Sequence, residues 1–204
     1  EGLFNADRKR LLPKIPKKIA LVASVESAAY ADFCKILQMR WPFCQVEVFD
    51  TLVQGENAPN QLVKAINEAN SKSNLADVLV ITRGGGSSDD LAAFNDERLV
   101  RAVASSRIPT MVAIGHEVDE CLSELAADVR ASTPSNAAEL VVPDRLAEQE
   151  SIYNMHKQLI ARISSFTALQ RASLRLYKNR LANSVSQLIS QEKANLLSNK
   201  QLLM

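Results

Sequence analysis

The sequence predicts an α/β protein: an open, mainly parallel Rossmann-like sheet with helices on both faces, followed by a long α-helical coiled-coil segment. Two observations carry this prediction. Between residues 18 and 114, short apolar runs alternate with stretches of helical character, a pattern typical of βαβ units. After Pro143 the chain contains neither glycine nor proline and is rich in Ala, Leu, Gln, Lys and Arg, which favours helix.

Four apolar runs are expected to be strands, because each is short and is separated from the next by a helical stretch. They lie at residues 18–23, 46–49, 78–81 and 110–114. Helices are expected at residues 28–39, 60–71 and 96–105. Strands of this kind are buried on both faces of a parallel sheet, so helices should cover both faces. The chain accordingly divides into a linker (1–17), an α/β domain (18–143) and a long helical arm (144–204).

Apolar residues recur along the arm at seven-residue spacing. They are Ile152, Leu159 and Phe166, then Leu174, Leu181 and Leu188, with Ile189, Leu196 and Leu203 as a second series. This spacing indicates a long helix or a helical hairpin whose apolar residues need a partner helix. Because Leu202-Leu203-Met204 carries no capping residue, we expect the arm to be a truncated part of a longer helix.

Composition excludes several classes of protein. Hydrophobic residues make up 47% and charged residues 23% of the chain, which excludes a disordered protein. No run approaches the roughly 20 apolar residues of a membrane span, and the first residues lack the order of a signal peptide. Cys34, Cys44 and Cys121 form neither a zinc motif nor a disulfide framework. We therefore expect a cytoplasmic protein with reduced thiols.

The net charge of +1 conceals an uneven distribution. Residues 1–143 carry 15 basic and 19 acidic residues, whereas residues 144–204 carry 9 and 4. Six basic residues and no acidic residue lie between Glu150 and Glu192: Lys157, Arg162, Arg171, Arg175, Lys178 and Arg180. A basic surface of this kind is typical of nucleic-acid contact, and a solvated helix face is the alternative.

A glycine-rich segment follows the third expected strand. Gly84, Gly85 and Gly86 account for three of the six glycines in the chain, and they are flanked by Arg83 and Ser87. Successive glycine N–H groups can point at one anion, and a guanidinium and a hydroxyl are suited to phosphate oxygens. The segment therefore predicts a phosphate site, with a simple tight turn as the alternative.

Titratable residues lie near the ends of neighbouring expected strands. His116 follows the fourth strand, and Asp119 comes three residues later, where a carboxylate can orient an imidazole for acid–base work. Asp32, in the first expected helix, is either a surface charge or a site residue. With Arg83 these three residues suit phosphoryl transfer, in which arginine neutralises charge and histidine moves a proton. Two alternatives stay open. His116 is a structural residue, or a divalent ion such as Mg²⁺ binds to Asp32, His116 and Asp119, although no clear ligand cluster supports the ion.

Several motifs together resemble the large subunit of exonuclease VII. They are Thr51-Leu-Val-Gln-Gly55, Arg83-Gly-Gly-Gly-Ser87 with Phe94-Asn-Asp-Glu-Arg98, Gly115-His-Glu-Val-Asp119 and Thr133-Pro-Ser-Asn-Ala-Ala-Glu139. They occur in the family's order, and Glu1-Gly-Leu-Phe4 resembles its linker after an N-terminal OB-fold, which is absent here. The segment Ala23-Ser-Val-Glu-Ser-Ala-Ala29 departs from the family's TSPTGAA-like turn, since it lacks the proline and the glycine.

The resemblance implies an exodeoxyribonuclease that degrades single-stranded DNA from both ends to oligonucleotides and nucleoside 5′-phosphates, with no required metal cofactor. It places the catalytic residues at Asp32, Arg83, His116 and Asp119. We expect phosphate to contact Gly84, Gly85, Gly86, Ser87, Thr133 and Ser135. It also implies a small helical subunit on the arm, and we expect homo-oligomers through the arm and no membrane.

Two other classes of function stay open on the residues alone. One is a non-catalytic nucleotide- or phosphate-binding α/β module with a coiled-coil assembly arm, in which Arg83 and the glycines only hold phosphate. The other is an assembly protein whose coiled coil is the functional part. The pair of His116 and Asp119 favours the enzyme, because holding phosphate needs no general base.

Overall fold

The chain is described by a computed structural model, in two compact units. The model describes the backbone of residues 2–84, 88–114 and 121–202, and the side chains of these residues except 88–90 and 197–202. The first unit is Glu1–Glu148 and the second is Gln149–Met204.

One parallel sheet organises the described part of the first unit. Its strands are β1 (Lys18–Ala23), β2 (Gln45–Asp50), β3 (Val78–Thr82), β4 (Thr110–Ala113) and β5 (Val129–Arg130), in the spatial order β2-β1-β3-β4-β5. β1 pairs with β2 on one side and with β3 on the other, and all pairs are parallel. The strand order therefore reverses at β1, because β2 lies on one side of it and β3 lies on the other. In sheets of this kind ligands bind in the crevice at the reversal, here beyond the carboxyl ends of β1 and β3.

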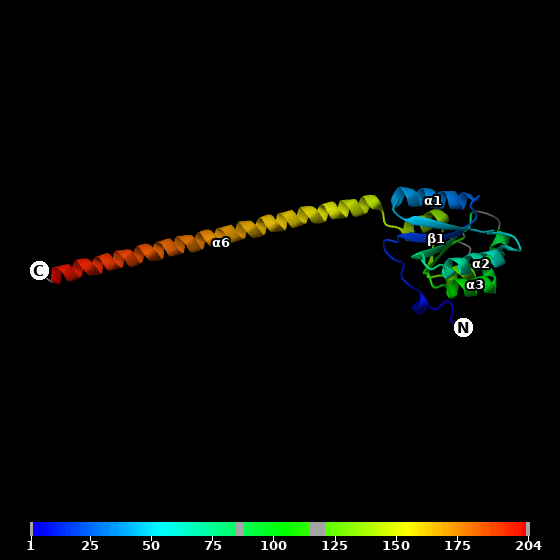
Figure 1. Cartoon of the computed structure of the whole chain (residues 1–204), viewed down its shortest axis with the longest axis horizontal. Coiled ribbons are helices and arrows are strands. Elements are labelled where there is room, and N and C mark those ends of the chain that lie inside the picture. The colour runs from blue at the N-terminus through cyan, green and yellow to red at the C-terminus, as the bar shows by residue number, and fades with distance from the viewer. Residues whose placement is uncertain (1, 85–87, 115–120, 203–204) are drawn as a thin grey trace. The chain divides into compact units, whose positions relative to one another are not determined.

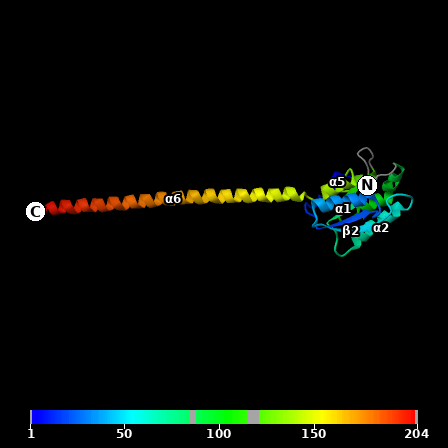
Figure 2. The ribbon, with the colours of Figure 1, turned by 90° about the horizontal axis from the view of Figure 1, so that it is seen from above.

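Helices cover both faces of the sheet, as expected. One face carries α1 (Ala28–Arg40) and α5 (Pro134–Val141), which bury Phe33, Leu37 and Val141 with apolar side chains of the sheet (Figure 2). The other face carries α2 (Ala58–Ser71), α3 (Glu97–Ala104), the 3₁₀ segment η2 (Ser88–Asn95) and α4 (Leu122–Ala126). Figure 1 shows α1 on one side of β1, with α2 and α3 on the other. The α/β prediction is confirmed.

The N-terminal segment is attached to the sheet by a buried carboxylate. After the short 3₁₀ turn η1 (Ala6–Arg8), Nη2 of Arg10 lies 2.8 Å from Oδ2 of Asp128. The same Asp128 oxygen accepts the backbone N–H of Thr110 at 2.7 Å. Burial alone raises the pKa of Asp128, but hydrogen bonds from Arg10 and Thr110 outweigh burial and lower the pKa overall. Asp128 thus ties residue 10 to the start of β4.

The second unit belongs to one unbroken helix. α6 spans Arg145–Leu202, 58 residues, so the arm is one helix and not a hairpin over these residues. The described side chains from Gln149 to Leu196 are all exposed. None of the described helices is both long and apolar enough to cross a membrane.

Candidate active site

The loop after β1 forms a tight turn without proline or glycine. Ser24 O accepts the backbone N–H of Ser27 at 3.0 Å and its hydroxyl at 2.6 Å. The Ser27 oxygen in turn accepts the N–H of Tyr30, which makes Ser27 the N-cap of α1. Ser24 and Ser27 therefore supply the hydrogen bonds of this turn, and α1 begins directly beyond the carboxyl end of β1.

Arg83 and Gly84 leave β3 beside the start of α1. The N–H of Arg83 donates to Ala113 O at 3.1 Å, which extends the pairing of β3 with β4 by one residue. A Cβ placed on Gly84 would lie 3.5 Å from Cβ of Ala29, in the first turn of α1. Arg83 is 5% exposed, and it interacts with another part of the protein. Segments that are far apart in sequence thus meet at the crevice between β1 and β3.

Asp32 lies on the exposed side of α1 near this meeting point. It follows Ala29 by three residues, a spacing that places two side chains on neighbouring parts of a helix surface. Asp32 is exposed on the outer side of α1, in the second turn of the helix, whereas Ala29, which adjoins Gly84, is buried.

The start of α5 brings Thr133 and Ser135 to the end of β5. The Thr133 side chain caps α5 by accepting the N–H of Asn136 at 3.0 Å, and Ser132 donates its N–H to the Asn136 side chain at 3.2 Å. A hydroxyl that accepts one bond still has a hydrogen to donate. Ser135 is half-buried in the first turn. Thr133 therefore has a structural role in addition to the one expected for it.

Five expected site residues lie outside the described residues. They are Gly85, Gly86, Ser87, His116 and Asp119. The described chain ends at Ile114, just beyond β4, and resumes at Cys121, which caps α4. Two buried polar residues, Thr82 and Glu124, lie near the ends of the described segments and are not among the site residues expected from the sequence.

Thr82, the last residue of β3, is one of these groups. It is 1% exposed, and its Oγ1 makes no hydrogen bond within the described part of the chain. Because side chains alternate along a strand, Thr82 shares a face with Val78 and Val80, which pack in the core beneath α1 and α5. Its polarity at a strand end was the only signal in the sequence.

Glu124 of α4 is the other group. It is 1% exposed, and its Oε2 lies 3.2 Å from Nε of Arg130. The same oxygen accepts the N–H of Cys121 at 3.4 Å, whereas Oε1 has no hydrogen-bond partner among the described residues. The neighbouring Cys121 thiol is buried as well, and its burial is the main reason that its pKa is raised. A carboxyl group is thus buried three residues after Cys121, where the described chain resumes.

The arrangement at the carboxyl edge suits an anion. α1 and α5 both begin there, and neither has an acidic residue in its first turn. Helix N-termini carry a partial positive charge, and Arg83 adds a full one. Among residues 2–84, 88–114 and 121–202, no group of three His, Cys, Asp or Glu side chains could hold a metal ion.

The fold defines an α/β protein whose sheet edge at the β1–β3 crossover suits an anion, joined in sequence to a long helix. The family model for exonuclease VII, large subunit, matches residues 3–204. The chain therefore belongs to the exonuclease VII large-subunit family.

Individual relatives agree with the family model. The exodeoxyribonuclease 7 large subunit of Brevibacillus brevis is 41% identical over 184 residues, which are 90% of this chain and 39% of that protein. The subunit of the same name from Xanthomonas oryzae is 49% identical over 145 residues, 71% of this chain and 32% of that protein. That of Aliivibrio fischeri is 40% identical over 181 residues, 89% and 40% respectively. The chain thus spans two-fifths or less of the length of these relatives.

Proposed function

We propose that this chain is the catalytic part of an exodeoxyribonuclease that hydrolyses single-stranded DNA from both ends to oligonucleotides and nucleoside 5′-phosphates. The observation that supports it most is the meeting of Arg83 and Gly84 with the first turn of α1 beyond β1 and β3. A guanidinium and a helix N-terminus together suit the phosphodiester anion. Family membership supplies the reaction class.

The proposed chemistry assigns a role to each residue. Water attacks phosphorus, the P–O3′ bond breaks, and the phosphate stays on the 5′ oxygen, as the products require. Arg83 neutralises the charge that grows on the phosphoryl oxygens. His116 transfers a proton to the departing 3′ oxygen or from the water, and Asp119 orients its ring. Asp32 orients the water from the surface of α1.

Phosphate contacts complete the proposed site. The backbone of Gly84, Gly85 and Gly86 and the hydroxyl of Ser87 would bind the phosphate at one end of the crevice. Thr133 and Ser135 would donate hydroxyl hydrogens from the start of α5. No metal ion is assigned to the reaction in this proposal, and its requirement is part of the test.

A direct test is the digestion of end-labelled single-stranded DNA by the complete enzyme, with and without EDTA. The expected result is release of label from either end, with activity in the chelator. Arg83→Ala and His116→Ala should both abolish release, while His116→Ala still retains DNA in a filter-binding assay. Retained binding with no cleavage by the wild-type complex would indicate the phosphate-holding module instead.

The proposal extends to partners and location. We infer that α6 associates with other helices, namely a small helical subunit or a second copy of the chain, because its apolar side chains are exposed along its length. The thiols of Cys34, Cys44 and Cys121 are free, which supports a location in the reducing cytoplasm. Light scattering of the purified protein at several concentrations, with and without the small subunit, tests the association.

A further inference from the structure

A basic segment runs along the edge of the sheet opposite the candidate active site. Residues 8–18 contain six basic residues and no acidic one. Arg10 pairs with Asp128, which also accepts a hydrogen bond from the first residue of β4. Further along, Lys17 O accepts the N–H of Gln45, the first residue of β2, at 2.8 Å. The segment therefore crosses the amino-terminal ends of the strands.

Three lysines of this segment present their ammonium groups to solvent. Lys9, Lys14 and Lys17 are exposed, and none of them forms an ion pair with a residue that the structure describes. Asp77 is an acidic residue at this edge, but its Oδ2 already accepts the backbone N–H groups of Lys17 at 2.7 Å and of Lys18 at 3.0 Å. The lysine charges are therefore available to an anionic partner.

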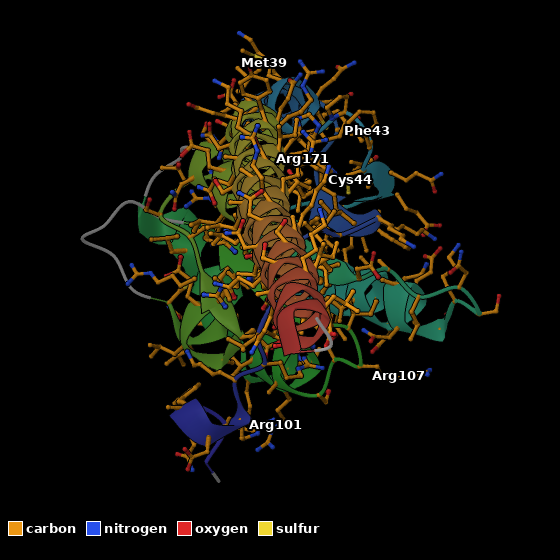
Figure 3. The ribbon with its side chains drawn as sticks, turned by 90° about the vertical axis from the view of Figure 1, so that its left-hand side faces the viewer. Met39, Phe43, Cys44, Arg101, Arg107 and Arg171 are labelled. Atoms are coloured by element: carbon orange, nitrogen blue, oxygen red, sulfur yellow. The ribbon has the colours of Figure 1, made fainter. Side chains whose placement is uncertain are left out.

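An exposed aromatic pair lies at the same edge, between α1 and β2. The rings of Trp41 and Phe43 meet edge to face, with their centroids 5.7 Å apart and their planes at 81°. Trp41 is half-buried against the core beneath α1, whereas Phe43 and Met39 are 70% and 71% exposed. Figure 3 shows Met39 and Phe43 at the outside of the first unit, with Cys44 beside Phe43. Trp41 thus holds an aromatic ring that is largely open to solvent.

The lysines and the aromatic pair are neighbours in space. Gln45, which is bonded to the backbone of Lys17, follows Phe43 by only two residues. Asp77 is close enough to Cys44 to contribute, after burial, to the rise of its thiol pKa to about 11. A cavity of about 230 Å³ opens at the same place, and its lining includes Trp41 and Cys44. Positive charge, an exposed ring and a cavity therefore meet at one corner of the amino-terminal edge.

This combination decides which partner fits. Single-stranded nucleic acid offers phosphates to lysines and unpaired bases to an aromatic ring, and such stacking adds to its affinity. A duplex would meet the lysines but not the ring, because its bases stack on one another. A second copy of this surface would bring lysines against lysines, which disfavours association.

We propose that Lys14, Lys17, Trp41 and Phe43 form a second surface for single-stranded DNA, on the side of the sheet away from the catalytic edge. We name these four residues the amino-edge surface. A base stacks on Phe43, and the neighbouring phosphates contact the two lysines. The use of this surface rests on the proposed function, since it would hold the DNA while another part of the same strand is cleaved. Strands of four to six residues, about 13–20 Å, separate the two edges, so only a long substrate reaches both.

The first test measures the contribution of the ring. Binding of a fluorescein-labelled oligothymidylate of about 20 nucleotides is followed by fluorescence anisotropy, with all variants made in a His116→Ala background of the 204-residue protein. Phe43→Leu should weaken binding at least about fivefold, because leucine is apolar but has no ring, whereas Phe43→Tyr should bind like the background protein. Phe4→Leu is the matched control, because Phe4 is 44% exposed and lies outside the amino-edge surface.

The second test measures the contribution of the charges. Lys14→Gln and Lys17→Gln should each reduce the dependence of log K on log salt by about 0.7, the value expected for one phosphate contact on a single strand. Lys64→Gln is the matched control, because it removes the same charge from an exposed position on α2, and its salt dependence should be unchanged.

The outcomes separate this proposal from its alternatives. Unchanged affinity of Phe43→Leu, or unchanged salt dependence of both lysine variants, would overturn the proposal. An equal loss of affinity for the matching duplex would contradict base stacking. A change in mass of Phe43→Leu by light scattering, with DNA binding unaltered, would assign the aromatic pair to a protein contact instead. Because binding is measured without cleavage, failure of the complete enzyme to cleave DNA would refute the nuclease proposal and leave this result unchanged.

Discussion

Replacement of Glu124 by glutamine tests whether the buried ion pair at the start of α4 supports the active site. The carboxylate is 1% exposed and is paired with Arg130 at 3.2 Å and with the N–H of Cys121 at 3.4 Å. Glutamine has nearly the same shape, so the substitution removes the charge and leaves no cavity. Any effect then comes from the lost charge–charge and charge-assisted contacts.

The expected size of the effect follows from the exposure of the two partners. Removal of one member of a buried ion pair costs about 3–5 kcal/mol. The Arg130 side chain is 31% exposed, so water compensates part of the lost partner, and we expect a loss of about 1–3 kcal/mol. For a unit of this size the melting temperature should fall by about 3–10 °C. Because Cys121 ends the segment that carries His116 and Asp119, the cleavage rate should also fall about tenfold to a hundredfold.

The assay pairs thermal unfolding, followed by near-ultraviolet circular dichroism, with single-turnover cleavage of labelled DNA by the complete enzyme. Glu139→Gln is the control, because Glu139 is exposed on α5 and loses the same charge. Its melting temperature and rate should match those of the wild type. If Glu124→Gln also unfolds and cleaves like the wild type, the ion pair contributes nothing and the reasoning is refuted.

Further substitutions test other parts of the structure. Arg83→Lys keeps the charge but loses the guanidinium fork, and single-turnover cleavage should fall by about 10²–10³-fold; a rate within threefold of wild type would contradict the role. Gly84→Ala should not lower the melting temperature, because its Cβ meets Ala29 at an ordinary contact distance of 3.5 Å; a drop of several degrees would contradict this. The pKa of Asp128 is lowered in the folded state, so its stabilisation is present above its ordinary pKa of 3.8 and is lost as the pH falls below that value. Asp128→Asn should therefore cost about 1–3 kcal/mol at pH 7 and flatten acid unfolding, as urea titrations at several pH values would show. His116→Ala should remove the neutral-pH step from the pH–rate profile, and an unchanged profile would exclude proton transfer by His116.

The longer elements of the fold could be predicted because they bury continuous apolar runs. β1 begins and ends at the residues where its apolar run does, and α6 follows from the absence of glycine and proline. The elements α4, β5 and α5 were not predicted, and α4 and β5, with five and two residues, are too short to show a periodicity. Thr133 followed by Pro134 was a usable signal for the start of α5, since a capping residue before proline is typical of a helix N-terminus.

The site was only partly predictable, since burial depends on packing between segments far apart in sequence. The sequence placed Arg83 at the end of a strand, but its near-complete burial depends on neighbouring strands and helices. The burial of Glu124, and that of the Thr82 hydroxyl without a hydrogen bond to the described residues, likewise depend on tertiary contacts. Neither residue has a local pattern that distinguishes it from a surface threonine or glutamate.

The two edge strands of the described sheet, β2 and β5, bear on whether this protein pairs with strands of other molecules. An exposed edge strand offers unpaired N–H and C=O groups to strands of other molecules, which leads to aggregation. β5 has only two residues, too few to template a long pairing. β2 is longer, but its Glu47 carboxylate lies 2.8 Å from Nζ of Lys18 and 3.5 Å from Nζ of Lys72. These lysines lower the pKa of Glu47, mainly through the hydrogen bond from Lys18. A strand that paired with β2 would have to remove these charges from contact with water, which is unfavourable. The ionic cluster therefore protects the edge strand β2 against pairing with strands of other molecules.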